Sequence, residues 1–196
     1  MTEQAHRKRI GIFGGSFNPI HNGHICLARQ ILAAVSLDEI WFVVSPLNPF
    51  KQEVTDLLPD DVRLELTREA LKDEPFLLAS DYEFGLPRPS YMWNTLAHLS
   101  NDYPQYSFSL IIGADNWVSF DRWARHDFIQ EHYQILVYPR EGYPVDASLL
   151  APNVKLVPTR LYPFSSTDIR TMVQKGQSVK GLVPDVILSK VEQLYR

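Results

Sequence analysis

A strand, a helix and a second strand follow one another within the first 44 residues, and this order constrains the fold more than any other feature of the chain. Residues 10–13 form an apolar run that ends at two glycines, and residues 40–44 form another that ends at Ser45-Pro46. Between the two runs, residues 24–35 place apolar side chains at helical spacing. Because such a crossover joins two strands that run in parallel, the order predicts an α/β fold with a parallel sheet.

The same alternation continues to the end of the chain. We expect further strands at residues 76–79, 108–112, 135–138 and 154–157, and further helices at residues 59–71, 91–99, 128–132, 166–175 and 184–195. The predicted fold is therefore a Rossmann-like parallel sheet with helices on both faces. A length of 196 residues suits a single domain, 1–196, on which the C-terminal helical part, about 165–196, is packed.

The composition is that of an ordinary globular protein, and it argues against several classes of partner. A net charge of -4 gives no basic field for nucleic acid. No apolar run approaches the ~20 residues of a membrane span. Cys26 is the only cysteine, so no internal disulfide forms, which suits a reducing compartment. We expect a cytoplasmic enzyme with no nucleic-acid or membrane partner, and the sequence leaves open whether it forms a homo-oligomer.

The segment from Gly14 to His24 joins the first strand to the first helix, at the edge of the sheet where α/β proteins bind their ligands. Glycines allow the backbone to approach a ligand closely and permit positive φ, and backbone N–H groups at a helix start attract anions. Ser16 and Asn18 add short polar donors. The residues of this segment therefore predict a phosphate-binding loop.

His21 and His24 are three positions apart in this loop. If the helix begins near His21, the spacing puts both imidazole rings on one face, where both can donate hydrogen bonds to one phosphate chain. A bound phosphate also raises their pKa values and favours their charged forms. Three other interpretations of this loop stay open. It could be a dinucleotide-binding loop with Asp38 or Glu39 as the ribose acceptor, although the G-x-G-x-x-G pattern is absent. It could also be a metal site, although further local ligands are missing, or a structural turn.

A second polar segment, Ser165 to Arg170, has the features of a helix start. Ser165 and Asp168 have the spacing of a capping box, with Asp in place of Glu. A well-capped helix alone would explain this pattern. Three hydroxyls and an arginine at a helix N-terminus are equally suited to phosphate, and the two interpretations are compatible.

Together, the two segments resemble the motifs of the nucleotidyltransferase superfamily, H/T-x-G-H within residues 14–24 and I-S-S-T-x-I-R at residues 165–170. Length, spacing and intermediate segments resemble one branch, the bacterial nicotinate (nicotinamide) mononucleotide adenylyltransferases, from residue 10 to about 174. The intermediate matches are Arg88-Pro89-Ser90-Tyr91, Gly113-Ala114-Asp115, Trp123 and Pro139-Arg140-Glu141-Gly142-Tyr143. The chain departs from the branch where Pro-Pro-His-Lys is frequent, since it has Pro46-Leu47-Asn48-Pro49-Phe50-Lys51 instead.

The resemblance implies a role for each matching position. It assigns His21, His24 and Arg170 to catalysis at the ATP phosphates. The further ATP-binding positions are Gly14, Gly15, Ser16, Phe17, Lys51, Gly113, Asp115, Ser165, Ser166 and Thr167. The mononucleotide-binding positions are Asn18, Ser90, Tyr91 and Trp123, the last three beside the pyridine ring. Trp117 is a further aromatic residue, for which a place in the core explains as much as a stacking role.

The implied reaction joins nicotinate mononucleotide and ATP to give deamido-NAD and pyrophosphate, a step of NAD biosynthesis. Because the attacking phosphate oxygen is already anionic at neutral pH, catalysis rests on positioning and charge stabilisation, without a general base. We expect Mg²⁺ as cofactor, held mainly by substrate phosphates and water, and assign no protein ligand to it. The alternatives are a pantetheine-phosphate adenylyltransferase, which shares both terminal motifs, and a non-catalytic nucleotide-binding regulator. The choice between the acid and the amide mononucleotide stays open.

Overall fold

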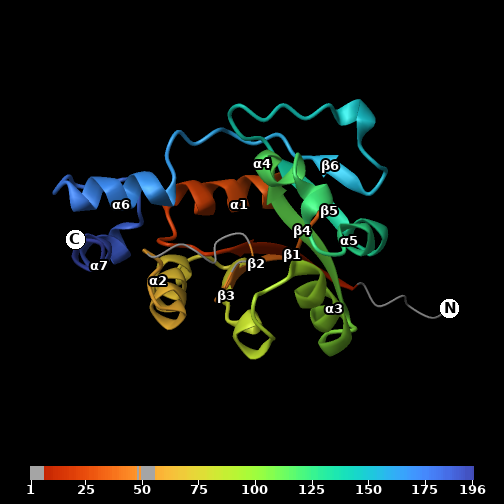
Figure 1. The fold of residues 1–196 in the computed structure, drawn as a ribbon, viewed down its shortest axis with the longest axis horizontal. Helices are drawn as coiled ribbons and strands as arrows, with labels where there is room; N and C mark the ends of the chain where they lie inside the picture. The colour runs from red at the N-terminus through yellow and green to blue at the C-terminus, as the bar shows by residue number, and fades with distance from the viewer. Residues whose placement is uncertain (1–6, 48, 50–55) are drawn as a thin grey trace.

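The computed structural model describes residues 7–47, 49 and 56–196, and within that part six strands form one parallel sheet. The strands are β1 (Lys8–Gly15), β2 (Glu39–Val44), β3 (Leu77–Ser80), β4 (Tyr106–Gly113), β5 (Gln134–Tyr138) and β6 (Val154–Leu156). Their order across the sheet is β3-β2-β1-β4-β5-β6 (Figure 1). The order reverses between β1 and β4, and the carboxyl ends of these two strands therefore border the crevice where open α/β sheets bind ligands.

Helices cover both faces of the sheet, which confirms the predicted fold class. They are α1 (Asn22–Ala34), α2 (Asp60–Leu71), α3 (Met92–Asp102), α4 (Ala114–Trp117), α5 (His126–His132), α6 (Ser166–Gln174) and α7 (Asp185–Leu194). One hydrophobic cluster joins α1, α2, α6 and α7 to one face of the sheet. A second cluster joins α3 and α5 to the other face. The C-terminal helices thus share their core with the first two strands.

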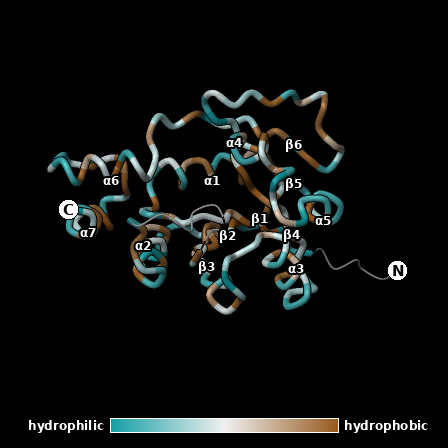
Figure 2. The backbone as a smooth tube through the Cα atoms, viewed as in Figure 1, coloured by the Kyte–Doolittle hydropathy of each residue, from teal (hydrophilic) through white to brown (hydrophobic). Residues whose placement is uncertain are grey.

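Alternate side chains of the strands enter the two clusters, as a sheet that is covered on both faces requires. In β1, Ile10 and Ile12 lie in the cluster beneath α3, whereas Phe13 lies in the cluster beneath α1. Figure 2 shows hydrophobic residues concentrated along β1 and the strands beside it, and hydrophilic residues on the outer side of α5. No helix in the described part of the chain is long and apolar enough to cross a membrane.

Every strand and helix expected from the sequence is present, with its ends shifted by a few residues at most. The sequence analysis missed α4 and three short 3-10 helices at Tyr82–Gly85, Phe120–Arg122 and Ala147–Leu149. Each is one turn or less, so apolar periodicity has no room to show in it. Three of the missed turns, α4, Tyr82–Gly85 and Phe120–Arg122, contribute residues that line the candidate site.

Candidate active site

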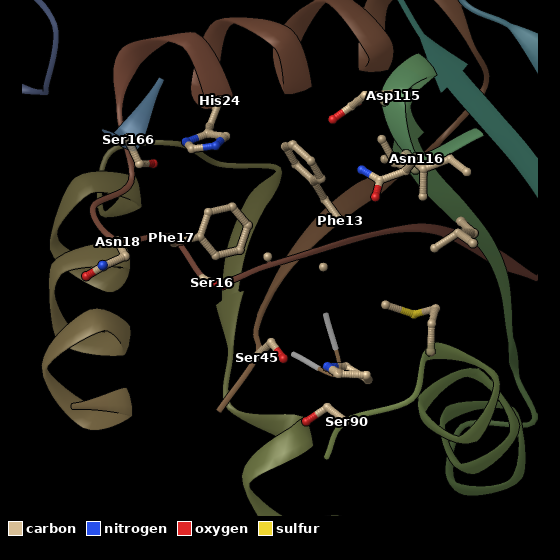
Figure 3. A pocket seen from close by; sticks show the side chains of 18 of the residues that line it. Phe13, Ser16, Phe17, Asn18, His24, Ser45, Ser90, Asp115, Asn116 and Ser166 are labelled. Atoms are coloured by element: carbon tan, nitrogen blue, oxygen red, sulfur yellow. The ribbon is translucent and has the colours of Figure 1, made fainter. Parts of the chain in front are cut away.

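A cavity of about 700 Å³ opens at the carboxyl ends of β1 and β4 (Figure 3). Every sequence-predicted site residue that the structure describes lines it: Gly14, Gly15, Ser16, Phe17, Asn18, His21, His24, Ser90, Tyr91, Gly113, Asp115, Trp123, Ser165, Ser166, Thr167 and Arg170. Lys51 lies outside the described residues, as does most of the segment that departs from the family pattern. The two segments predicted to bind phosphate, residues 14–24 and 165–170, therefore meet in one place, while the roles assigned to individual residues stay predictions.

The two loop histidines stack on each other at the start of α1, as their spacing predicts. His21 immediately precedes the helix, and the centroids of the two rings are 3.6 Å apart. The backbone N–H of His21 donates to Nδ1 of His24 at 3.3 Å. Since Nδ1 accepts this bond, a neutral His24 carries its proton on Nε2, the nitrogen that can donate to a ligand.

His21 is almost fully buried, and this sets its charge. Burial, together with the nearby charge of Arg140, lowers the pKa of His21 to about 3, whereas Asp168 acts in the opposite direction. The ring is therefore neutral at pH 7. Its Nδ1 atom is buried and receives no hydrogen bond of good geometry, although the backbone N–H of His24 faces the His21 side chain in a capping-box arrangement. An anionic ligand that reached this atom would satisfy it and favour its protonated form.

The glycines of the loop allow close packing, whereas the left-handed backbone conformation occurs at another residue. Gly14 and Gly15 lie in β1 with ordinary φ, and a Cβ at Gly14 would come within 2.6 Å of the Met92 side chain. Phe17, with φ of 44°, is the residue in the left-handed region. Its ring packs edge-on against the ring of His24, with centroids 5.2 Å apart (Figure 3). The loop glycines therefore do not use the positive φ that glycine permits, because the chain turns after the strand, at Phe17.

The start of α6 contains the predicted capping box. The Ser165 hydroxyl accepts from the backbone N–H of Asp168, and the Asp168 carboxylate accepts from the backbone N–H of Ser165. The Ser166 hydroxyl donates to the carbonyl of Pro19 at 2.8 Å, which fastens α6 to the first loop. Both hydroxyls are thus used inside the protein, and the backbone N–H groups of the first turn are the donors best placed for an anion.

Arg170 reaches across from α6 to the first loop. Its Nη1 donates to the carbonyl of Asn18 at 2.9 Å, and its Nε donates to the carboxylate of Asp56 at 2.8 Å. The Arg170 side chain is only 13% exposed, whereas that of Asp56 is 47% exposed. Asp56 therefore occupies part of the guanidinium fork that a phosphate would use.

The carboxamide of Asn18 is turned away from the cavity (Figure 3) and is used within the protein. Its Nδ2 donates to the carbonyl of Asp56 at 3.0 Å. Its Oδ1 accepts from the backbone N–H of Leu58 at 3.2 Å and from the hydroxyl of Tyr195 at 2.6 Å. The structure thus shows Asn18 holding the loop in place, and its assignment to the mononucleotide stays a prediction.

At the other end of the cavity, Asp115 follows directly from β4 through α4. Its Oδ1 atom forms an ion pair with Nε of Arg140 at 3.4 Å. A Cβ at position 113 would lie 2.3 Å from the same oxygen, so Gly113 is required for this approach. Trp123 lines the cavity, whereas Trp117 does not and instead stacks on Phe120 within the core at 5.4 Å.

Glu83 is a residue of the cavity that the sequence analysis missed. It is 2% exposed, and its Oε1 accepts from the hydroxyl of Thr95 at 2.8 Å. Burial raises its pKa, while the hydrogen bond from the Thr95 hydroxyl acts in the opposite direction. Further lining residues without an assigned role are Ser45, Asn116, Arg122, Tyr138 and Arg140. A glutamate in a one-turn helix between predicted elements gives no signal in a single sequence.

The carboxylates of the cavity do not form a protein-built metal site. Among residues 7–47, 49 and 56–196, no three His, Cys, Asp or Glu side chains come together to hold a metal ion. Glu83 and Asp115 are the acidic residues that line the described cavity. This donor set fits a divalent cation that arrives with its phosphates better than one bound by the protein alone.

The comparisons with known proteins agree with this site. The family model described as cytidylyltransferase-like matches residues 12–172. A Bacteroides fragilis protein named probable nicotinate-nucleotide adenylyltransferase is 44% identical over 187 residues, which cover 95% of this chain and 92% of that protein. A protein of the same name from Bacteroides thetaiotaomicron is 45% identical over 193 residues, 98% and 95% of the two chains. The chain belongs to the nicotinate-nucleotide adenylyltransferase family.

Solved structures confirm the fold of this adenylyltransferase at greater evolutionary distance. The Plasmodium falciparum nicotinic acid mononucleotide adenylyltransferase complexed with NaAD superposes with a TM-score of 0.80 at 19% identity, covering 96% of this chain and 97% of the other. A Vibrio parahaemolyticus structure titled as a nicotinate-nucleotide adenylyltransferase gives a TM-score of 0.69 at 22% identity, covering 96% of each chain. The Rossmann-like nucleotidyltransferase architecture is thus shared even where most side chains differ.

Proposed function

We propose that this enzyme transfers the adenylyl group of ATP to nicotinate mononucleotide, forming deamido-NAD and pyrophosphate in NAD biosynthesis. The observation that carries the proposal is the arrangement of the cavity. The histidine pair and the start of α6, both suited to phosphates, meet at one end, and Ser90, Tyr91 and Trp123 line the same space. The names of the relatives with over 40% identity support the choice of the acid mononucleotide.

For this reaction the protein must align the mononucleotide phosphate with the α-phosphate of ATP and stabilise the negative charge on the leaving pyrophosphate. An oxygen of the mononucleotide phosphate attacks the α-phosphorus of ATP, and the bond from that phosphorus to the bridging oxygen breaks as pyrophosphate leaves. Nε2 of His24 donates to the α-phosphate or the bridging oxygen, while Arg170 and the N–H groups at the start of α6 bind the leaving pyrophosphate. For Arg170 to bind bidentately, the ATP phosphate must replace the carboxylate of Asp56.

Two further parts of the proposal concern the cofactor and the location. Substrate phosphate oxygens and water would be the main ligands of Mg²⁺, and the ion would supply positive charge that neutralises the phosphates. Lys51 supplies another positive charge to the phosphates. The reaction takes place in the cytoplasm, a location that the single cysteine supports.

One assay tests the proposal directly. The purified protein is incubated with ATP, Mg²⁺ and, in turn, nicotinate mononucleotide, nicotinamide mononucleotide or phosphopantetheine, and pyrophosphate release is measured. We expect the fastest release with nicotinate mononucleotide. Release with phosphopantetheine alone would contradict the proposed acceptor, and no release with any acceptor would contradict the transfer reaction itself.

The variant His24→Ala tests the mechanism. We expect kcat to fall roughly 10²–10³-fold, the range for losing one donor to the transition state. The circular dichroism spectrum and melting temperature serve as the control for folding, since His24 sits at a helix start on the rim of the cavity. Turnover close to that of the unaltered enzyme would remove His24 from the mechanism.

A further inference from the structure

Arg63, on α2, is a fully buried arginine that lies behind the loop of the active site. It is 1% exposed, and it forms no ion pair with any described residue. Its guanidinium donates instead to three backbone carbonyls, those of Ser16 at 2.5 Å, Ser45 at 2.9 Å and Leu58 at 2.8 Å. Burying a charge without a counter-ion is costly, so an arginine at such a position calls for an explanation.

The three carbonyls belong to three different segments around the cavity. Ser16 follows β1, Ser45 follows β2, and Leu58 precedes α2. Ser16 and Ser45 both line the cavity. Because a guanidinium is planar and rigid, one side chain fixes the relative positions of these segments from the side opposite the ligand.

The loop between these anchors contains the strained residue Phe17. A side chain at φ of 44° is strained, and such a conformation persists only where its surroundings hold it in place. On one side of Phe17, Arg63 binds the carbonyl of Ser16. On the other side, the hydroxyl of Tyr195 binds the carboxamide of Asn18. The two anchors together keep Phe17 in the left-handed region.

The conformation of Phe17 in turn determines what His24 packs against. The Phe17 ring is 4% exposed and meets the His24 ring at an interplanar angle of 82°. If Phe17 relaxed to an ordinary φ, its ring would leave this contact, and the His24 ring would lose its support on that side. The position of a ligand-facing imidazole thus depends on a buried arginine that does not line the cavity.

We propose that Arg63 is a positioning residue of the adenylyl-transfer site, acting through Ser16 and Phe17 on the ring of His24. This inference rests on the proposed function for its kinetic consequence, but the effect on His24 does not depend on activity. Arg63 does not touch the substrates. It fixes the loop before they bind, so that the imidazole needs no rearrangement in the transition state.

The test replaces Arg63 by lysine, which keeps the positive charge but has all its donors on one nitrogen and lacks the planar fork that spans Ser16, Ser45 and Leu58. In Arg63→Lys we expect kcat to fall about 10²-fold, the cost of misplacing a reacting group by about 1 Å, with KM for ATP and mononucleotide changed by less than about threefold. In the ligand-free protein, the ring signals of His24 should shift in ¹H–¹³C NMR. The chain has six histidines, and the His24 signals are assigned as those that are missing from the spectrum of His24→Ala.

Arg68→Lys is the matched control, because Arg68 lies on the same helix, is 56% exposed and pairs with Asp81 at the surface. Neither kcat nor the His24 signals should change in it. An Arg63→Lys protein with a lower melting temperature, but with unaltered kcat and His24 signals, would show that Arg63 serves stability alone and would overturn the proposal.

A second variant keeps the inference testable if Arg63→Lys fails to fold. Tyr195→Phe removes only the hydroxyl that anchors Asn18, and we expect the His24 signals to shift and kcat to fall in the same direction. Its control is Tyr133→Phe, which removes a hydroxyl from another buried tyrosine, bonded to Ser100. Unchanged His24 signals in Tyr195→Phe would overturn the two-sided anchoring of the loop.

Failure of the proposed function can be told apart from failure of this inference. Absence of pyrophosphate release in the unaltered enzyme would contradict the proposed function, while the NMR result would still decide the positioning role.

Discussion

At the scale of single residues, His21 links the site to the pH dependence of stability. Its pKa falls from 6.5 in the unfolded chain to about 3 in the folded protein, mainly through burial. Between these values the unfolded state binds more protons, so the free energy of unfolding must decrease as the pH falls below about 6.5. One such group contributes up to about 1.4 kcal/mol per pH unit in this range.

The variant His21→Gln isolates this contribution. Urea unfolding of both proteins at several pH values between 4 and 7 gives the difference in their free energies of unfolding, and the variant should lose less stability on acidification. Glu83, whose raised pKa has the opposite effect, is present in both proteins and cancels in the difference. Parallel curves for the two proteins would mean that His21 is protonated as easily in the folded state as in the unfolded chain.

At the scale of elements, the cap of α6 stabilises the helix start at which we propose that phosphate binds. Ser165→Ala removes the hydroxyl that accepts from the backbone N–H of Asp168, and we expect the free energy of unfolding to fall by about 1 kcal/mol. Ser178→Ala, which removes an exposed hydroxyl bonded to Glu192, should change it far less. Equal effects of the two changes in urea titrations would contradict the capping role.

The elements also show what could be predicted from the sequence. Periodicity located the strands and long helices, since each buries a regular apolar face. The loop from Gly14 to His24 could be placed at the edge of the sheet because it follows the first strand, whereas Ser165–Arg170 could be placed only at a helix start. Phe17 was beyond this reasoning, because its positive φ depends on Arg63 and Tyr195, which are distant in sequence. Glu83 was missed since nothing in its short helix distinguishes a buried carboxyl from a surface one.

At the scale of the whole molecule, the two hydrophobic clusters share one sheet, and this predicts how the protein unfolds. The four tryptophans (Trp41, Trp93, Trp117 and Trp123) all pack against the cluster on the α3 side. Ile187 of α7 is fully buried in the other cluster. If the chain is a single domain, a destabilising change at Ile187 must also shift the unfolding transition that the tryptophans report on the other face of the sheet.

We therefore expect Ile187→Ala to lower the free energy of unfolding by about 2–5 kcal/mol. Its unfolding curves from tryptophan fluorescence and from far-ultraviolet circular dichroism should keep the same midpoint, because strands whose side chains enter both clusters couple the two faces. Leu96→Ala, in the cluster that the tryptophans report on, is the matched variant and should shift both signals equally. The opposite result is a circular dichroism midpoint that falls in Ile187→Ala while the fluorescence midpoint stays unchanged. It would show that residues from about 165 to 196 unfold as a separate unit. The hydrogen bond from Tyr195 to Asn18 opposes such separate unfolding, since loss of α7 would also release the loop that contains Asn18.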